Sequence, residues 1–156
     1  MLEKVLSANK NIARIVELGT GYGGLTLFFG IQMMARNGKV LSFDIKEKML
    51  SPWHKLARQL PITFKQKDVF DATALQEVKR FISGARSLVF CDNGNKKKEL
   101  PLYARILKKN DLIMVHDWGI EIGPAELDVK ILSILTMYRQ DEFDALKTRI
   151  LSMIRV

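Results

Sequence analysis

The fold of this chain is decided by residues 16–25, which read Val-Glu-Leu-Gly-Thr-Gly-Tyr-Gly-Gly-Leu. The β-branched and apolar residues 13–18 predict a buried strand before the glycines, and the apolar residues 25–35 predict a buried helix after them. Glycines in such a position let the backbone bend sharply and approach a ligand closely. Residues 16–25 therefore predict a strand–loop–helix unit that binds a ligand, which is more specific than a glycine-rich loop alone.

Outward from this unit, strands and helices alternate along the chain. Further strands are predicted at 39–43, 62–66, 87–91, 112–116 and 148–155, with a helix as the alternative for the last. Helices are predicted at 2–8, from residue 51, at 72–82, around 100–107 and at 125–138. This order favours a Rossmann-like, doubly wound, mostly parallel sheet in a three-layer α/β/α fold. A chain of 156 residues is expected to form a single domain, residues 1–156.

The composition is that of a globular protein, with 47% hydrophobic and 27% charged residues. Cys91 is the only cysteine, which excludes an intramolecular disulfide and favours a cytoplasmic location. The first seven residues do not resemble a secretory signal, and no apolar run reaches the roughly 18 residues of a membrane span. The net charge of +8 is attributed to solubility, because the basic residues are scattered apart from residues 96–98. Attraction to nucleic acid is the alternative, and a homodimer stays open.

The glycine spacing fits two ligands. Gly19, Gly21 and Gly24 match the dinucleotide pattern G-x-G-x-x-G, whereas Gly19, Gly21 and Gly23 follow Glu17 as E-x-G-x-G-x-G. A dinucleotide presents a pyrophosphate, which needs free N–H groups and the positive end of a helix. S-adenosylmethionine has no phosphate and carries a sulfonium cation. Because an acidic residue suits a cation better than a pyrophosphate, Glu17 favours S-adenosylmethionine.

Aspartates end the next strands. Asp44 follows the strand at 39–43, where its carboxylate can accept hydrogen bonds from both ribose hydroxyls. Asp68 follows the strand at 62–66 and could accept a hydrogen bond from the adenine amine, while the Val69 N–H donates to the adenine ring. An equal alternative is that Asp68 is an ordinary turn residue without contact to the ligand. The expected cofactor residues are Glu17, Gly19, Thr20, Gly21, Tyr22, Gly23, Asp44, Ile45, Asp68, Val69 and Asp92.

These residues resemble those of class I S-adenosylmethionine-dependent methyltransferases. Residues 17–23 are similar to the first motif of that family, and residues 42–44 (Ser-Phe-Asp) to the second. Residues 90–92 and 114–117 most resemble the cephalosporin-hydroxylase and macrocin O-methyltransferase group. The resemblance implies a minimal methyltransferase fold, methyl transfer to a small-molecule hydroxyl, and a divalent metal such as Mg²⁺ held by Asp92 and Asp117.

The catalytic base is expected beside that metal position. Metal-dependent relatives usually carry a second oxygen ligand next to the fifth-strand aspartate, whereas this chain has His116 before Asp117. Either His116 or Asp117 could take the proton of the acceptor, since the pKa of histidine lies near neutrality. A packed strand residue is the alternative for His116.

Three other functions stay open at this point. They are a nucleic-acid methyltransferase, a nicotinamide-dependent oxidoreductase and a non-catalytic module that binds S-adenosylmethionine. The net charge favours the first, and the glycines permit the second. The third is suggested because the first strand is expected soon after the start of the chain, without the N-terminal helices that cover the substrate in relatives.

Overall fold

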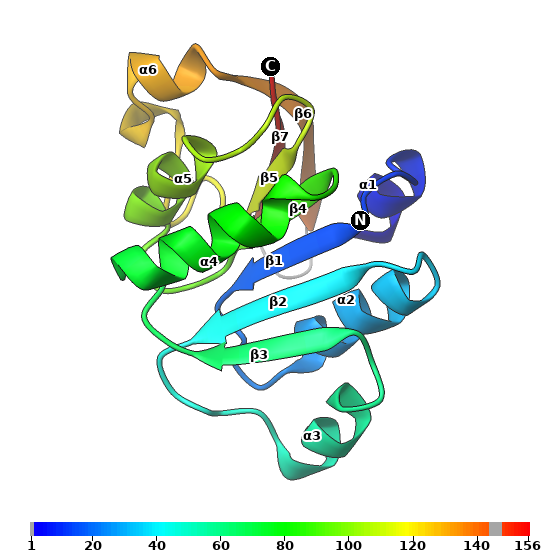
Figure 1. Cartoon of the computed structure of the whole chain (residues 1–156). Helices are drawn as coiled ribbons and strands as arrows, with labels where there is room; N and C mark the ends of the chain where they lie inside the picture. Colours follow the sequence, from blue (N-terminus) through cyan, green and yellow to red (C-terminus); the bar gives the residue numbers. More distant parts are fainter. Residues whose placement is uncertain (1, 144–147) are drawn as a thin grey trace.

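The computed structural model describes residues 2–143 and 148–156, and Figure 1 shows how its elements are arranged. In chain order they are α1 (Leu2–Ala8), β1 (Arg14–Leu18), α2 (Gly24–Met34), β2 (Lys39–Asp44), α3 (Ser51–Ala57), β3 (Ile62–Gln66), α4 (Ala72–Ser83), β4 (Ser87–Cys91), α5 (Lys96–Ala104), β5 (Leu112–Val115), the 3₁₀ turn η1 (Pro124–Glu126), α6 (Val129–Leu132), β6 (Leu135–Phe143) and β7 (Thr148–Arg155). Within the described ranges, no helix is long and apolar enough to cross a membrane.

The strands form one seven-stranded sheet in the order β3-β2-β1-β4-β5-β7-β6. Neighbouring strands among β1 to β5 pair in parallel, and β7 runs antiparallel to both β5 and β6. The chain leaves β3 at one edge of the sheet and returns on the far side of β1 as β4. In sheets of this kind, ligands bind beyond the carboxyl ends of the strands that flank such a switch point. The topology therefore predicts a ligand site beyond the carboxyl ends of β1 and β4.

Apolar side chains cover both faces of the sheet. Along β4, Leu88 and Phe90 belong to a buried cluster with residues of α1 and α2, whereas Val89 and Cys91 belong to a second cluster with residues of α4 and α5. This alternation follows from the two-residue period of a strand. Figure 1 shows α4 in front of the sheet and α2 behind it. The predicted three-layer α/β/α fold is confirmed.

The predicted helix at 125–138 is wrong. A 3₁₀ turn and the single helical turn of α6 occupy its first part, and β6 begins at Leu135. Leu127, Ile131 and Leu135 recur every fourth residue and all belong to the same core cluster, but they come from the turn after η1, from α6 and from β6, and not from one continuous helix. Pairing with β7 draws the chain from Leu135 onward into the sheet. The other predicted elements are confirmed with small shifts of their ends, including the strand at 148–155.

Candidate cofactor and acceptor site

A cavity of about 370 Å³ lies at the switch point, beyond the carboxyl ends of β1, β2 and β4. This volume is within the range of small-ligand sites. The lining residues come from the glycine loop and from the turns after β2 and β4: Gly19, Thr20, Gly21, Tyr22, Gly23, Gly24, Leu25, Asp44, Ile45, Lys48, Asp92, Asn93 and Gly94. Eight of the eleven expected cofactor residues are among them.

The glycine loop is held between β2 and β4. The backbone N–H groups of Gly19 and Thr20 both donate to the carbonyl oxygen of Phe43, at 2.9 and 3.1 Å. Gly19 adopts a φ of 107°, and a Cβ atom there would lie 2.6 Å from the carbonyl oxygen of Asp92. Both the backbone conformation and the close approach to Asp92 therefore require glycine at this position.

Asp44 is oriented toward the cavity by two backbone donors. Its Oδ2 accepts from the N–H of Gly21 at 2.9 Å, and its Oδ1 accepts from the N–H of Lys46 at 3.1 Å. Each carboxylate oxygen can accept more than one hydrogen bond, so both remain able to accept from a diol. The charged side chains that line the cavity are two carboxylates, Asp44 and Asp92, and one lysine, Lys48. This lining suits a cationic nucleoside better than a pyrophosphate.

Glu17 lies beneath the loop and not in the cavity wall. Its side chain is fully buried, and its Oε2 accepts from Ser42 Oγ at 2.5 Å and from Thr26 Oγ1 at 2.6 Å. Oε1 has no hydrogen-bond partner among the described residues. Burial raises the pKa of Glu17 to about 7, although both hydroxyl donors oppose the shift. Glu17 therefore ties β1 to α2 and β2 instead of facing the cavity, unlike the direct contact with a cation that its position in the sequence favoured.

Asp68 and Val69 also lie outside the cavity wall. Asp68 is exposed, and its Oδ1 accepts from the N–H of Phe70 at 2.9 Å, as in an ordinary aspartate turn. Val69 is buried, and its carbonyl oxygen accepts from the Tyr103 hydroxyl at 2.6 Å. This geometry matches the turn alternative for Asp68.

Five lining residues were not predicted: Gly24, Leu25, Lys48, Asn93 and Gly94. The adjacent pair Asn93-Gly94, directly after the strand-end Asp92, is a turn signal that could have identified the wall beyond β4.

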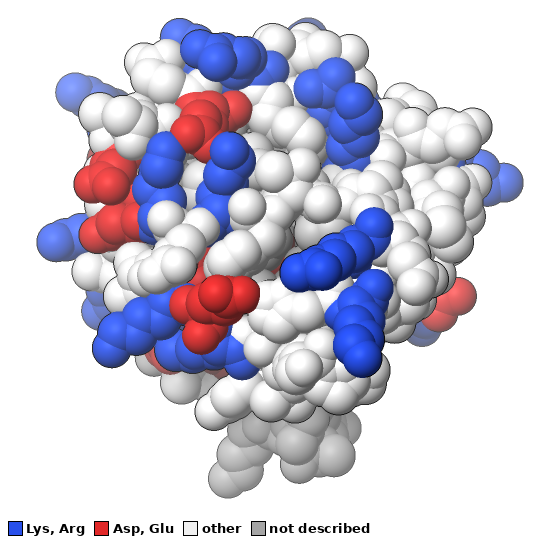
Figure 2. Space-filling view, turned by 60° about the horizontal axis from the view of Figure 1, so that its bottom comes forward, with Lys and Arg blue, Asp and Glu red and all other residues white. Residues whose placement is uncertain are grey.

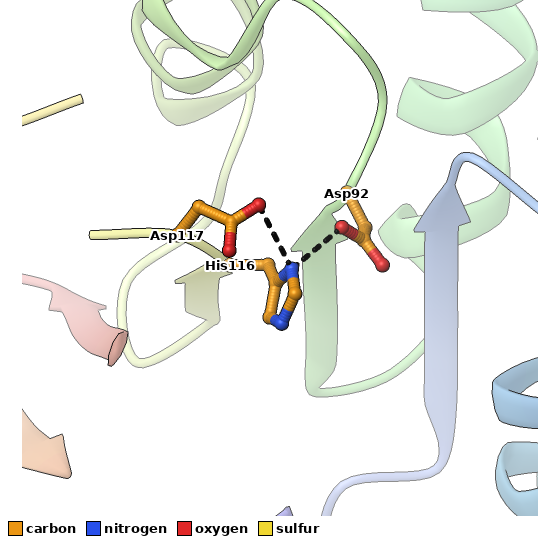
Figure 3. Close-up of side chains that lie close together, drawn as sticks. All are labelled: Asp92, His116 and Asp117. Carbon is orange, nitrogen blue, oxygen red and sulfur yellow. Dashed lines mark ion pairs between the residues drawn. The ribbon is translucent and has the colours of Figure 1, made fainter. Parts of the chain in front are cut away.

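Beside the cavity, three side chains from the ends of β4 and β5 converge. His116 Nδ1 lies 3.0 Å from Asp92 Oδ1 and 3.2 Å from Asp117 Oδ2. Figure 3 shows the imidazole between the two carboxylates, with Nε2 on the side of the ring away from them. The hydrogen bond with Asp92 raises the pKa of His116 above its usual value, although partial burial opposes the charge. The predicted cluster is thus brought together, and Asp92 belongs both to it and to the cavity wall.

Lys96 also reaches this cluster, which the sequence did not predict. Its side chain is 4% exposed, and its Nζ lies 3.3 Å from Asp117 Oδ2 and 2.8 Å from Glu121 Oε2. Burial opposes the charge of Lys96, but the hydrogen bond with Glu121 and the nearby aspartates outweigh it and raise the pKa of the ammonium group. Lys96, at the start of α5, is therefore enclosed by carboxylates, whereas Lys97 and Lys98 are exposed.

The donor set fits a divalent metal poorly in this arrangement. Asp92, His116 and Asp117 offer atoms within 4.8 Å of one another, as a metal site requires. Mg²⁺ prefers about six oxygen ligands, whereas this set supplies two carboxylates and a nitrogen. An ammonium group already lies within 4 Å of both carboxylates. The Asp92 and Asp117 metal site therefore stays a prediction that the observed contacts do not favour.

Comparisons with known proteins place the chain in a family. A family model described as rhamnosyl O-methyltransferase/CmcI matches residues 6–130, which include the glycine loop and the His116 cluster. A putative O-methyltransferase from Klebsiella pneumoniae superposes with a TM-score of 0.65 at 18% identity, covering 99% of this chain and 78% of that one. A comparison with curated proteins found no match.

Two other solved structures contain S-adenosylhomocysteine. One is 1,6-didemethyltoxoflavin-N1-methyltransferase from Burkholderia thailandensis, with a TM-score of 0.65, 13% identity, and coverage of 99% of this chain and 76% of that one. The other is an RNA methyltransferase from Salinibacter ruber, with a TM-score of 0.62, 15% identity, and coverage of 99% and 90%. At these identities the structures support the fold, and the family follows from the match over residues 6–130. This chain belongs to the rhamnosyl O-methyltransferase/CmcI family and is a class I S-adenosylmethionine-dependent methyltransferase.

Proposed function

We propose that this protein methylates a hydroxyl group of a small molecule, with His116 as the general base. The proposal rests on Asp92, which borders the cavity and also contacts His116. Asp92 lines the cofactor cavity, and its Oδ1 also lies 3.0 Å from Nδ1 of His116. The proposed proton acceptor is thereby held beside a residue of the cavity wall.

The orientation of His116 supports its role as a base. Because the two aspartates hold Nδ1, the neutral imidazole carries its proton there and presents an unprotonated Nε2. Among the described residues, Nε2 has no hydrogen-bond partner, and the side chain is 30% exposed. Nε2 can therefore accept a proton from an acceptor hydroxyl, in the way that a carboxylate orients the histidine of a catalytic triad.

Methyl transfer at this site depends mostly on positioning. When bound, S-adenosylmethionine supplies a methyl carbon that its sulfonium charge activates. Asp44 is proposed to hold the ribose, and the glycine loop the methionine part of the cofactor. The acceptor would approach from the side of His116 and Asp117, so that its oxygen meets the methyl carbon while His116 takes the proton. Metal assistance is not needed for this arrangement.

A nucleic-acid substrate is the second candidate, because the net charge is +8. Figure 2 shows Lys and Arg side chains in separate groups over one face, with acidic side chains between some of them and no continuous basic stripe. Lys96, Lys97 and Lys108 are paired with carboxylates. This distribution favours the small-molecule acceptor. Binding to nucleic acid would instead show a steep dependence on salt concentration.

Calorimetry and turnover test the proposal together. We expect saturable binding of S-adenosylmethionine and S-adenosylhomocysteine, and no binding of reduced nicotinamide dinucleotides. S-adenosylhomocysteine release is then measured with a panel of small phenols, sugars and hydroxy acids, and with RNA and DNA oligonucleotides at rising salt. Turnover with a hydroxylated small molecule supports the proposal. Turnover confined to the oligonucleotides, or release without any acceptor, would contradict it.

A further inference from the structure

We propose that Lys96 is a built-in cation at the acceptor side, taking the position expected for a divalent metal, so that the site works without one. Lys96 acts through Asp92 and Asp117 and is a positioning residue. This inference rests on the proposed function, since it assigns a role in the same site. It differs from the expectation drawn from the family resemblance, which implied a metal at these two aspartates.

The ammonium group of Lys96 has several anionic and polar partners. Nζ lies 2.8 Å from Glu121 Oε2 and 3.3 Å from Asp117 Oδ2, and it donates to the carbonyl oxygen of Asn93 at 3.1 Å. Asp92 Oδ1 lies further away, at 3.8 Å. An ammonium group has three protons to donate, and here it makes two hydrogen bonds, to Asn93 and Glu121, and an ion pair with Asp117. Lys96 is therefore a buried lysine with defined partners and not an exposed surface lysine.

The local structure directs Lys96 inward and its neighbours outward. Glu99 is fully buried, and its two oxygens accept from the N–H groups of Asn93 and Asn95, at 3.4 and 3.3 Å. These contacts hold the turn between β4 and α5, and α5 begins at Lys96 directly after it. Lys97 and Lys98, which follow directly, are both exposed. Only one lysine of this run is thus available to the carboxylate cluster.

The charges around Lys96 explain why it would exclude a metal. Asp92, Asp117 and Glu121 place three carboxylates around one ammonium group. A divalent ion bound by Asp92 and Asp117 would lie a few ångströms from that ammonium group, where repulsion between buried like charges is strong. Removal of the ammonium group would leave the carboxylates uncompensated. They would then attract a divalent ion, together with His116 as a third ligand.

Manganese binding tests this inference, because Mn²⁺ can be followed by electron paramagnetic resonance without any methyl acceptor. The EDTA-treated wild-type protein is expected to show no saturable Mn²⁺ site below about 1 mM. Lys96→Met should gain one site that is at least about tenfold tighter. Lys96→Met combined with Asp117→Asn should lose that gain. Lys98→Met is the matched control, and it should behave as wild type because Lys98 is exposed.

The outcomes separate this inference from the proposed function. Binding of S-adenosylhomocysteine is measured on the same samples, so a protein without cofactor binding contradicts the proposed function and not the role of Lys96. Tight Mn²⁺ binding by the wild type that Asp117→Asn abolishes would overturn the inference, and this measurement needs no Lys96 variant. An unchanged Mn²⁺ affinity in folded Lys96→Met, or in Lys96→Gln if the first variant does not fold, would also overturn it.

Discussion

Asp44 and Asp68 offer a matched pair for testing where the cofactor binds. Asp44 is the last residue of β2 and Asp68 lies two residues beyond the end of β3, and each accepts a hydrogen bond from the backbone N–H two residues later. Only Asp44 lines the cavity, and only Asp44 also accepts from the N–H of Gly21 in the glycine loop. Replacing each aspartate by alanine therefore removes the same type of turn contact, but removes a ligand-facing carboxylate in one case alone.

The expected loss follows from the contacts of the carboxylate. Both Asp44 oxygens keep an acceptor position for a ribose hydroxyl, and a hydrogen bond to a charged group contributes about 1.5 to 3 kcal/mol. Because Asp44 is partly exposed, water replaces some of this contribution in the variant. We expect Asp44→Ala to weaken cofactor binding by about 1 to 3 kcal/mol, which corresponds to about 5- to 150-fold.

Isothermal titration calorimetry with S-adenosylhomocysteine measures this difference directly. Asp68→Ala should leave the affinity within about twofold of wild type, because Asp68 is exposed and lies outside the cavity wall. Thermal melting of both variants checks that each remains folded. An unchanged affinity in folded Asp44→Ala would refute the placement of the ribose. Equal losses in the two variants would show that the effect comes from the turns and not from the ligand.

Three further changes probe the loop, the buried acid and the base. Gly19→Ala should lower the free energy of unfolding in urea by about 2 kcal/mol or more, because its Cβ would meet the Asp92 carbonyl at a strained φ. Gly94→Ala is the control, and it should leave the free energy of unfolding almost unchanged because a Cβ at Gly94 meets open space. Burial raises the pKa of Glu17 from 4.5 to about 7, so the folded protein favours the protonated carboxyl. The free energy of unfolding should therefore fall by up to about 3 kcal/mol as the pH rises from 4.5 to about 7. Glu17→Gln should reduce this pH dependence, and an equal pH dependence in the variant and the wild type would contradict the raised pKa of Glu17. His116→Ala should reduce turnover by about 10² to 10⁴-fold while cofactor affinity stays constant, and retained turnover would remove His116 as the base.

The glycine loop and the acidic strand ends could be predicted from the sequence because they depend on the local backbone conformation and on the direction of the strands. A backbone that turns at positive φ between a strand and a helix calls for glycine, and Gly19, Gly21 and Gly23 all adopt such angles. Parallel strands bring their carboxyl ends to one edge, so Asp44, Asp92 and the residues after β5 could be expected together. The order of elements then led to the class of fold.

Other features depended on contacts between distant segments. The helical spacing of residues 125–138 could not reveal that β7 would pair with this part of the chain and extend the sheet. Glu17 was expected to face the ligand, but the packing of α2 and β2 places Thr26 and Ser42 against its carboxylate. Burial and hydroxyl donors, which arise only on folding, thus changed the role of this residue.

The sequence was sufficient to determine the features that depend on neighbouring residues: the glycine loop, the alternation of strands and helices, and the acidic strand ends. The tertiary structure alone decided which charged groups face one another. Lys96 and Glu121 are 25 residues apart and meet Asp117 only because the turns after β4 and β5 close over the same edge of the sheet. Electrostatic contacts depend on separation in space and not on separation along the chain, so the ammonium group at the carboxylate cluster became visible only in the folded protein.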